Sequence, residues 1–255
     1  GLVDNPGGGS LASFPLSVNT QARVFHMPQA YTWNFTVERE VMRNTVLSLS
    51  YVGRRGIYGQ REKNINQPLI GTVQANPGIN INALRPFKGY GPIRQTYNDA
   101  NSIYHGLQFE LNRRFSNGLS YGFAYTLSKC EDYNSDNVRG RNGFPQANNP
   151  YNPAANKGPC DYDRRHNFNL AGTYSFSGSG PVAGGWAVGS VFTALSGRPF
   201  TPNVAGRDQS GQDTGSLRAD CFAAPIYNFD TSYLYPDADT TRPFITNAAA
   251  AFGTP

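Results

Sequence analysis

The sequence predicts an all-β protein of about six long antiparallel strands that run up and down, joined by alternately short and long connections. Three observations favour this fold. Apolar and polar residues alternate over stretches of about ten residues, Asn, Gly and Pro concentrate between those stretches, and the connections sort by length. The composition agrees, because 28 Gly, 18 Pro, 15 Tyr and 16 Phe in 255 residues disfavour helices and suit strands with turn-rich loops.

The clearest strand is predicted over residues 119–130. Its alternate residues are Leu119, Tyr121, Phe123, Tyr125 and Leu127, and small or polar residues stand between them. A period of two over about ten residues matches the length and pattern of a tilted strand that crosses a membrane. Few strands of soluble sandwiches run so long with one wholly apolar face.

Weaker forms of the same pattern predict five further strands. They are expected at residues 31–41, 45–54, 103–115, 164–176 and 185–196. Short turns would follow the first, third and fifth strands in chain order, and long loops at 55–102, 131–163 and 197–255 would follow the others. This sorting is typical of outer-membrane barrels, which have short periplasmic turns and long extracellular loops. A soluble β-sandwich adhesin fits the composition but not the sorted loops.

Six strands are too few to close a large barrel, so the chain is expected to be one segment of a larger one. The polar face of the third and fourth strands would line its lumen, with Gln108, Glu110, Asn112, Ser120 and Thr126 as the candidates. Aromatic residues near strand ends are expected to form the girdles at the two membrane interfaces, namely Tyr31, Trp33, Tyr104, Tyr121, Phe176 and Trp186.

Composition also excludes other classes of protein. No apolar run approaches the roughly 18–20 residues that a membrane-spanning helix needs. The net charge of +5 comes from scattered basic pairs rather than a basic stripe, so no nucleic-acid partner is expected.

Three cysteines match no zinc or redox spacing. Cys130 ends the fourth strand and Cys160 precedes the fifth, so a disulfide across the base of the loop is expected, with two free thiols as the alternative. Such a bond would stabilise the loop by about 3–4 kcal/mol. Cys221 is left without a partner in this chain, and would pair with a missing part of the protein or with another chain.

The densest charged cluster precedes the fifth strand at the outer rim, and comprises Asp161, Asp163, Arg164, Arg165 and His166. It is interpreted as a salt-bridged strand entrance with arginines that reach the interface; a calcium site or contacts to lipopolysaccharide phosphates are the alternatives. His26, His105 and His166 are too widely spaced for a metal site. No nucleophile elbow, P-loop or zinc-protease motif occurs, so neither an enzyme nor a cofactor is expected.

Five ordered motifs carry a family resemblance. They are Gly89-Tyr90-Gly91-Pro92-Ile93 with residues 100–108, Asn112 to Leu119, Tyr125 to Lys129, Asp161 to Phe168, and Ser196-Gly197-Arg198-Pro199-Phe200. In this order they resemble the C-terminal barrel of Oar-like TonB-dependent receptors, the type with an N-terminal carboxypeptidase-regulatory-like domain. The resemblance covers most of residues 30–200.

The resemblance implies a 22-stranded barrel with an internal plug that imports bulky ligands with energy from TonB. This sequence departs from that pattern, since it has no plug, no TonB-contacting segment and no final strand ending in an aromatic residue. The chain is therefore expected to be a receptor fragment in the outer membrane, at the cell surface, that contacts TonB only through the missing parts.

The function predicted is that of the barrel portion of such a receptor, which binds a bulky ligand with its outer loops and passes it along the polar face. The alternative is a processed, receptor-derived fragment whose exposed strand edges pair with further copies, giving an extracellular structural filament.

Overall fold

The computed structural model describes residues 15–135, 151–180 and 184–200, together with four short strands farther along the chain. These strands are β9 (Asn203–Ala205), β10 (Ser216–Arg218), β11 (Asp220–Cys221) and β12 (Phe252–Gly253). β9 pairs with β10 and β11 pairs with β12. The expected loop 197–255 is therefore interrupted by strand pairs, and the rest of it beyond residue 200 lies outside the described residues.

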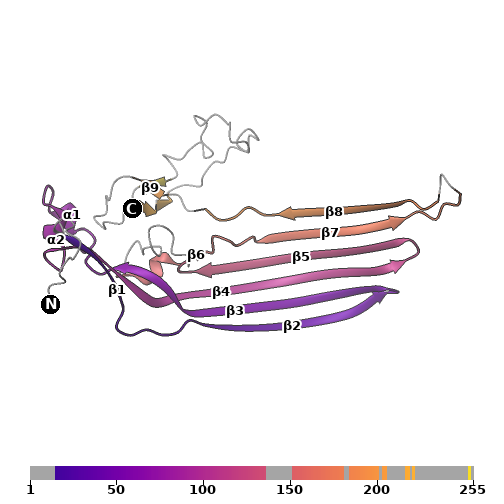
Figure 1. Ribbon diagram of the computed structural model, residues 1–255, viewed down its shortest axis with the longest axis horizontal. Coiled ribbons are helices and arrows are strands. Elements are labelled where there is room, and N and C mark those ends of the chain that lie inside the picture. The colour runs from indigo at the N-terminus through magenta and orange to yellow at the C-terminus, as the bar shows by residue number, and fades with distance from the viewer. Residues whose placement is uncertain are drawn as a thin grey trace, which may run out of the picture.

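One open sheet dominates the structure (Figure 1). Its main path is β2 (Gln29–Met42), β3 (Thr45–Asn64), β4 (Tyr90–Ser116), β5 (Leu119–Asp132), β7 (His166–Ser175) and β8 (Ala187–Leu195). Each strand on this path is antiparallel to its neighbours. β1 (Leu16–Gln21) adds to β4 in parallel, and β6 (Gly158–Pro159) pairs with the end of β5. The predicted all-β, up-and-down architecture is confirmed.

Two strands are much longer than the sequence predicted. β3 has 20 residues and β4 has 27, whereas about 10 suffice to cross a membrane. The expected loop 55–102 is therefore wrong in its bounds, because its two ends continue β3 and β4 and only residues 65–89 connect them. We call the parts of β3 and β4 that lie within residues 55–64 and 90–102 the outer extension. Its residues do not alternate between apolar and polar, because polar side chains lie on both faces. The sequence therefore gives no sign that this part forms strands.

The connection between β3 and β4 contains the short helices α1 (Thr72–Ala75) and α2 (Ile81–Leu84). Both lie at the end of the sheet opposite the β7–β8 hairpin (Figure 1). The connection between β5 and β7 contains η1 (Pro153–Asn156) and β6, so the expected loop 131–163 is also partly structured. Its residues 136–150 lie outside the described part of the chain.

Two of the three expected short turns form where the sequence predicts them, and residues 181–183 of the third lie outside the described part of the chain. Asn117 and Gly118 have φ angles of 53° and 78°, as both central residues of a type I′ hairpin turn require. A Cβ on Gly118 would lie 2.5 Å from the Ser175 carbonyl oxygen, so this turn needs glycine for space as well as conformation. At the β2–β3 turn, Asn44 has a φ of 63° and its N–H donates to Glu40 Oε1 at 3.0 Å.

The register gathers the apolar residues on one face of the sheet. Leu49, Phe109, Tyr125 and Phe168 form one cross-strand row, and Leu47, Leu111, Phe123, Leu170 and Phe192 form the next. Between these rows, Phe109, Phe123, Phe168 and Phe192 make successive edge-to-face contacts with ring centroids 5.5, 5.1 and 5.7 Å apart. Each such contact adds about 0.5–1.5 kcal/mol to the burial of the rings.

The opposite face is polar. One row contains Ser50, Gln108, Thr126 and Asn167, and the next contains Ser48, Glu110, Ala124 and Asn169. Cross-strand hydrogen bonds between side chains join Thr36 to Ser50 at 2.9 Å and Ser48 to Glu38 at 3.3 Å. The sheet therefore separates an apolar surface from a polar one from β2 to β7. In β8 the two faces are less distinct, because Val191 and Leu195 lie on the polar side opposite Ala171 and Asn167.

Among the described residues, no helix is both long and apolar enough to span a membrane.

The apolar face yields a first prediction, for the complete protein that contains these strands. Phe123→Arg should lower the free energy of unfolding by about 2–4 kcal/mol, because it places a guanidinium in the lipid. Ala124→Arg is the matched control, because this neighbour on the same strand faces the polar side. Heat-dependent mobility in gel electrophoresis and denaturant titration would measure the folded fraction. Equal losses in the two variants would contradict the assignment of the faces.

Candidate functional site

The connection between β3 and β4 is a folded unit around a buried asparagine. Asn66 is fully buried, and its side-chain amide donates to the carbonyl oxygens of Phe87 at 3.0 Å, Tyr90 at 3.2 Å and Gly91 at 2.8 Å. Its Oδ1 accepts from the Phe87 N–H at 2.7 Å. Arg85, 2% exposed, donates to the Asn66 carbonyl at 2.9 Å. This polar core holds the connection against the start of β4.

An ion-paired group stabilises the outer extension of β3 and β4. The Arg61 guanidinium, only 1% exposed, contacts both oxygens of Asp99, and the Lys63 ammonium contacts the same carboxylate. Partial burial acts to raise the pKa of Asp99, but hydrogen bonds from Arg61 and Lys63 outweigh it and leave that pKa below its ordinary value of 3.8. The carboxylate is therefore ionised at neutral pH, as the burial of Arg61 requires.

A bulge interrupts the pairing of β3 and β4 between Gly56 and Gln60. Within it, Tyr58 has a φ of 60°, which is uncommon for a bulky residue. Asn98 donates from Nδ2 to the Tyr58 carbonyl oxygen at 3.2 Å, and the ring of His26 stacks on the Tyr58 ring with centroids 4.8 Å apart. These contacts fix the strained residue, and the segment before β2 is thereby held against the bulge. Bulges often redirect side chains beside functional sites.

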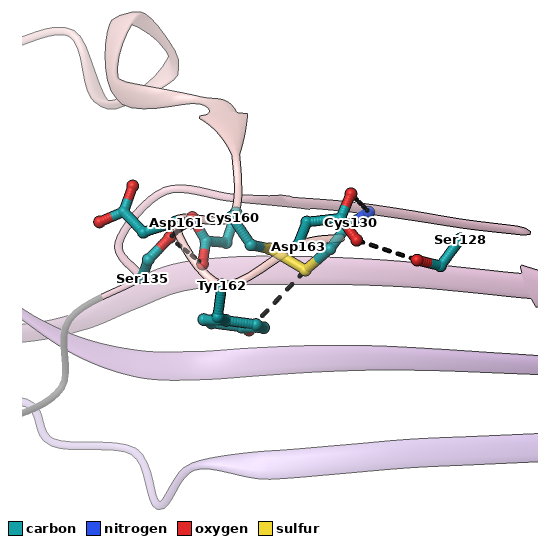
Figure 2. The surroundings of a disulfide bond; sticks show 8 residues. Ser128, Cys130, Ser135, Cys160, Asp161, Tyr162 and Asp163 are labelled. Atoms are coloured by element: carbon teal, nitrogen blue, oxygen red, sulfur yellow. Dashed lines mark hydrogen bonds between the residues drawn. A yellow bond between two sulfur atoms is a disulfide. The ribbon is translucent and has the colours of Figure 1, made fainter. Parts of the chain in front are cut away.

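The expected disulfide joins Cys130 to Cys160 (Figure 2). Their Cα atoms lie 5.4 Å apart, within the usual range for such bonds. The Cys160 N–H also donates to the Cys130 carbonyl at 3.1 Å. The side chain of Cys221 lies outside the described residues.

The Asp163 carboxylate secures the end of β5 beside this bond (Figure 2). One oxygen accepts from the Ser128 hydroxyl at 3.0 Å, and the other accepts from the Cys130 N–H at 3.2 Å. Arg164 donates to the Ser196 carbonyl at 3.0 Å, and His166 Nδ1 lies 2.8 Å from the Tyr125 hydroxyl. These residues therefore contact their surroundings rather than each other.

The interpretation of the cluster as a salt-bridged entrance is wrong for the described residues, since no ion pair forms among its members. The reason is that Asp163 already accepts from Ser128 and Cys130, while Asp161 and Arg165 are exposed. The rim ion pairs lie nearby instead, where Glu131 contacts Lys129 at 2.7 Å and Lys157 at 3.0 Å. Hydrogen bonds from both lysines lower the pKa of Glu131 to about 2.

A pocket of about 360 Å³ opens on the polar side at the outer end of the sheet. Its floor comes from β3 and β4, where the small residues Gly56, Gly59 and Ala100 leave room. Tyr162, Asp132 and Asn134 form one wall, and the segment from Pro28 to Ala30 forms another. We refer to this as the mouth pocket.

The disulfide and the bulge both shape the mouth pocket. The Tyr162 hydroxyl lies 3.7 Å from the Cys130 sulfur, so the bond and the tyrosine are in contact (Figure 2). Asn134 donates to the Gln60 carbonyl at 3.1 Å and thereby ties the loop to β3 next to the bulge. Segments distant in sequence are thus held together around one cavity.

Arg54 is the cation among the residues that line the mouth pocket. Its exposed guanidinium forms no hydrogen bond or ion pair with any described residue. Asp132, in contrast, is 7% exposed and accepts from the Ser135 hydroxyl at 3.0 and 2.9 Å. Burial and then the charge of Asp132 raise the pKa of Tyr162 above 10.0, against the opposing effect of Arg54, so its hydroxyl is protonated at neutral pH.

The five lumen candidates all lie on the polar face. Gln108 stands directly opposite Thr126, Asn112 opposite Gly122, and Glu110 opposite Ala124, while Ser120 pairs with Thr173. They lie at successive positions along β4 and β5, away from the mouth pocket, and do not form a single site.

One of the residues expected in the aromatic girdles, Tyr104, lies on the polar face instead. Tyr104 stands opposite Arg54 and Cys130, and its hydroxyl lies over Gly106, so it belongs to the polar side. The reason is that side chains alternate between the two faces along a strand. Tyr104 is four residues from Gln108, on the polar face, and three residues from Leu107, on the apolar face. Trp33 and Tyr121 do lie on the apolar face, two residues from Phe35 and Phe123 on their own strands.

Sequence reasoning missed the residues that build the mouth pocket, above all Arg54, Tyr58 and Tyr162. The paired glycines at positions 56 and 59 were a usable signal, since glycine inside a strand marks a bulge or a close approach. Among the described residues, no group of three acidic, histidine or cysteine side chains is arranged to hold a metal ion.

The ion-paired group yields a second prediction. Asp99→Asn leaves the buried Arg61 guanidinium without its counter-charge and should weaken the outer extension by about 1–3 kcal/mol. Because the native pKa is lowered, this stabilisation is complete above pH 3.8 and is lost as the pH falls through the native pKa. The variant should therefore lack that acid-dependent loss.

Hydrogen exchange of peptides from β3 and β4 in the complete protein would measure the effect. Asp161→Asn is the control, because the Asp161 side chain is exposed. Indistinguishable exchange in the two variants at neutral pH would show that the Arg61–Asp99 pair does not stabilise the extension.

The comparisons with known proteins agree with this architecture. The family described as outer membrane beta barrel domain matches residues 2–255. Searches of curated proteins and of solved structures found no match. The match covers nearly the whole chain, and the structure has the apolar face, the polar face and the turns of a barrel wall. The chain belongs to the outer membrane beta barrel domain family.

Proposed function

We propose that this chain is the barrel portion of a TonB-dependent receptor that binds a bulky ligand at the cell surface and passes it inward. The observation that carries the proposal is the mouth pocket, at the outer end of the same polar face that presents Gln108, Glu110 and Asn112. A ligand held there would lie at the head of a polar path. The ordered motifs that resemble Oar-like receptors support the same function.

In this proposal the chain binds and passes a ligand and catalyses no reaction. Its apolar face contacts outer-membrane lipid, and the five polar-face residues line the lumen. Contact with TonB would be made by other parts of the complete protein, which would also supply a movable plug. Neither a cofactor nor a nucleic-acid partner takes part.

A second candidate function is an extracellular filament formed from a processed fragment. The observation in its favour is that β2 and β8 are the two edges of the open sheet, and their side chains are exposed throughout. Unpaired edges of this kind can template further strands.

Conductance in planar lipid bilayers tests the main proposal and yields a third prediction. A plugged receptor should be silent in buffer, and should conduct reversibly when several molar urea loosens the plug but leaves the barrel intact. In the urea-opened state, Glu110→Gln should reduce the preference for cations over anions, because it removes a carboxylate from the lumen.

Permanent conductance in buffer would indicate an open pore and contradict the receptor. Unchanged ion selectivity in Glu110→Gln would remove that residue from the lumen. Long filaments in negative stain, without a heat-dependent mobility shift, would support the second candidate instead.

A further inference from the structure

The mouth pocket has the features of a preformed site rather than an incidental gap between strands. Its floor depends on the bulge, where Tyr58 is held in a strained conformation by Asn98 and His26. A Cβ on Gly56 would lie 2.4 Å from the Ser102 hydroxyl oxygen, and one on Gly59 would lie 3.1 Å from the Ala100 carbonyl oxygen. Side chains at these two positions would crowd the floor, so glycine keeps it clear, and pockets that bind ligands are usually largely preformed.

The wall of the pocket is equally fixed. Tyr162 lies two residues after Cys160 and its hydroxyl lies 3.7 Å from the Cys130 sulfur, and Asn134 is tied to the backbone of β3. Little ordering of these side chains would be needed on binding, so less affinity would be lost to immobilising them.

The two charged side chains of the pocket, Asp132 and Arg54, differ in how accessible they are to a ligand. Asp132 is nearly buried and its carboxylate accepts a hydrogen bond from the Ser135 hydroxyl. Arg54 lines the cavity with an exposed side chain, and its guanidinium forms no hydrogen bond or ion pair with any described residue. A guanidinium offers a planar fork that matches a carboxylate in two parallel hydrogen bonds.

We propose that the mouth pocket binds a carboxylate group of the ligand, which Arg54 holds in a bidentate contact while the Tyr162 hydroxyl donates a further hydrogen bond. The polar side chains of Asn101, Ser102 and Asn134 line the remaining space and suit the hydroxyl or amide groups next to that carboxylate. The ligand class is therefore an acidic polar chain, such as a uronic-acid saccharide or a peptide with a free carboxylate. This inference rests on the proposed function for its biological meaning but not for its chemistry.

Matched charged and neutral probes test whether the carboxylate is bound and whether it belongs to a saccharide or to a peptide. The charged probes are trigalacturonate and acetyl-trialanine, and the neutral probes are the methyl ester of the first and the amide of the second. Binding to the complete protein in detergent would be followed by saturation-transfer NMR titration, which detects weak ligands and needs no TonB. Preference for the saccharide or the peptide identifies the source of the carboxylate.

Substitutions at two adjacent arginines supply the fourth prediction. Arg54→Gln should weaken binding of the charged probe about tenfold or more, leave the neutral probe unchanged, and be partly rescued by Arg54→Lys. Arg55→Gln is the control, because Arg55 lies on the opposite face of β3, opposite Tyr31 and Ile103. A heat-dependent mobility shift confirms that each variant is folded.

Several results would overturn the inference. They are equal binding of charged and neutral probes, an Arg55→Gln effect as large as that of Arg54→Gln, and no binding of either charged probe at millimolar concentration. Failure of the receptor proposal would appear separately, as permanent conductance in the bilayer experiment with binding at Arg54 retained.

Discussion

The cross-strand register of β3, β4, β5 and β7 places Tyr51, Leu107 and Leu127 in one row and Ser50, Gln108 and Thr126 in the adjacent one. Everything else in the structure depends on that register, because side chains in a strand alternate between faces. A slip by a single residue would turn the apolar rows toward the polar side and the polar rows toward lipid. In a bilayer every such row would destabilise the fold, since lipid offers no hydrogen-bond partners to the polar side chains.

The outer extension of β3 and β4 follows a different rule. Water is available there, so strands can carry polar side chains on both faces and bury some of them. The most deeply buried side chains of the extension and of the connection between its two strands include Arg61, Arg85, Gln67 and Asn66, and ion pairs and hydrogen bonds to the backbone fix most of them. This polar packing tolerates a bulge, and the bulge is what makes space for the mouth pocket next to a loop held by a disulfide.

The membrane-type part of the fold could be predicted from sequence because one physical signal, the alternation of apolar residues, acts there without competition. The strands at 119–130 and 45–54 begin where that alternation begins. The outer extension could not be predicted in the same way, because residues such as Arg61, Lys63 and Asp99 give no two-residue period. The disulfide could be predicted because Cys130 and Cys160 stand at the ends of strands expected to be neighbours. The place of Arg54 in the pocket could not be predicted, because no local pattern in the sequence shows which side chains line that cavity.

The alternation of the two faces is the central claim, and a cysteine scan along residues 120–127 of β5 tests it most directly. Each position would be replaced by cysteine in the complete protein, in outer-membrane vesicles, and treated with a charged, water-soluble maleimide. Labelling should alternate, with even positions such as Ser120 and Thr126 reactive and odd positions such as Phe123 and Tyr125 protected by lipid. Uniform labelling of odd and even positions would contradict a strand that separates lipid from a polar lumen.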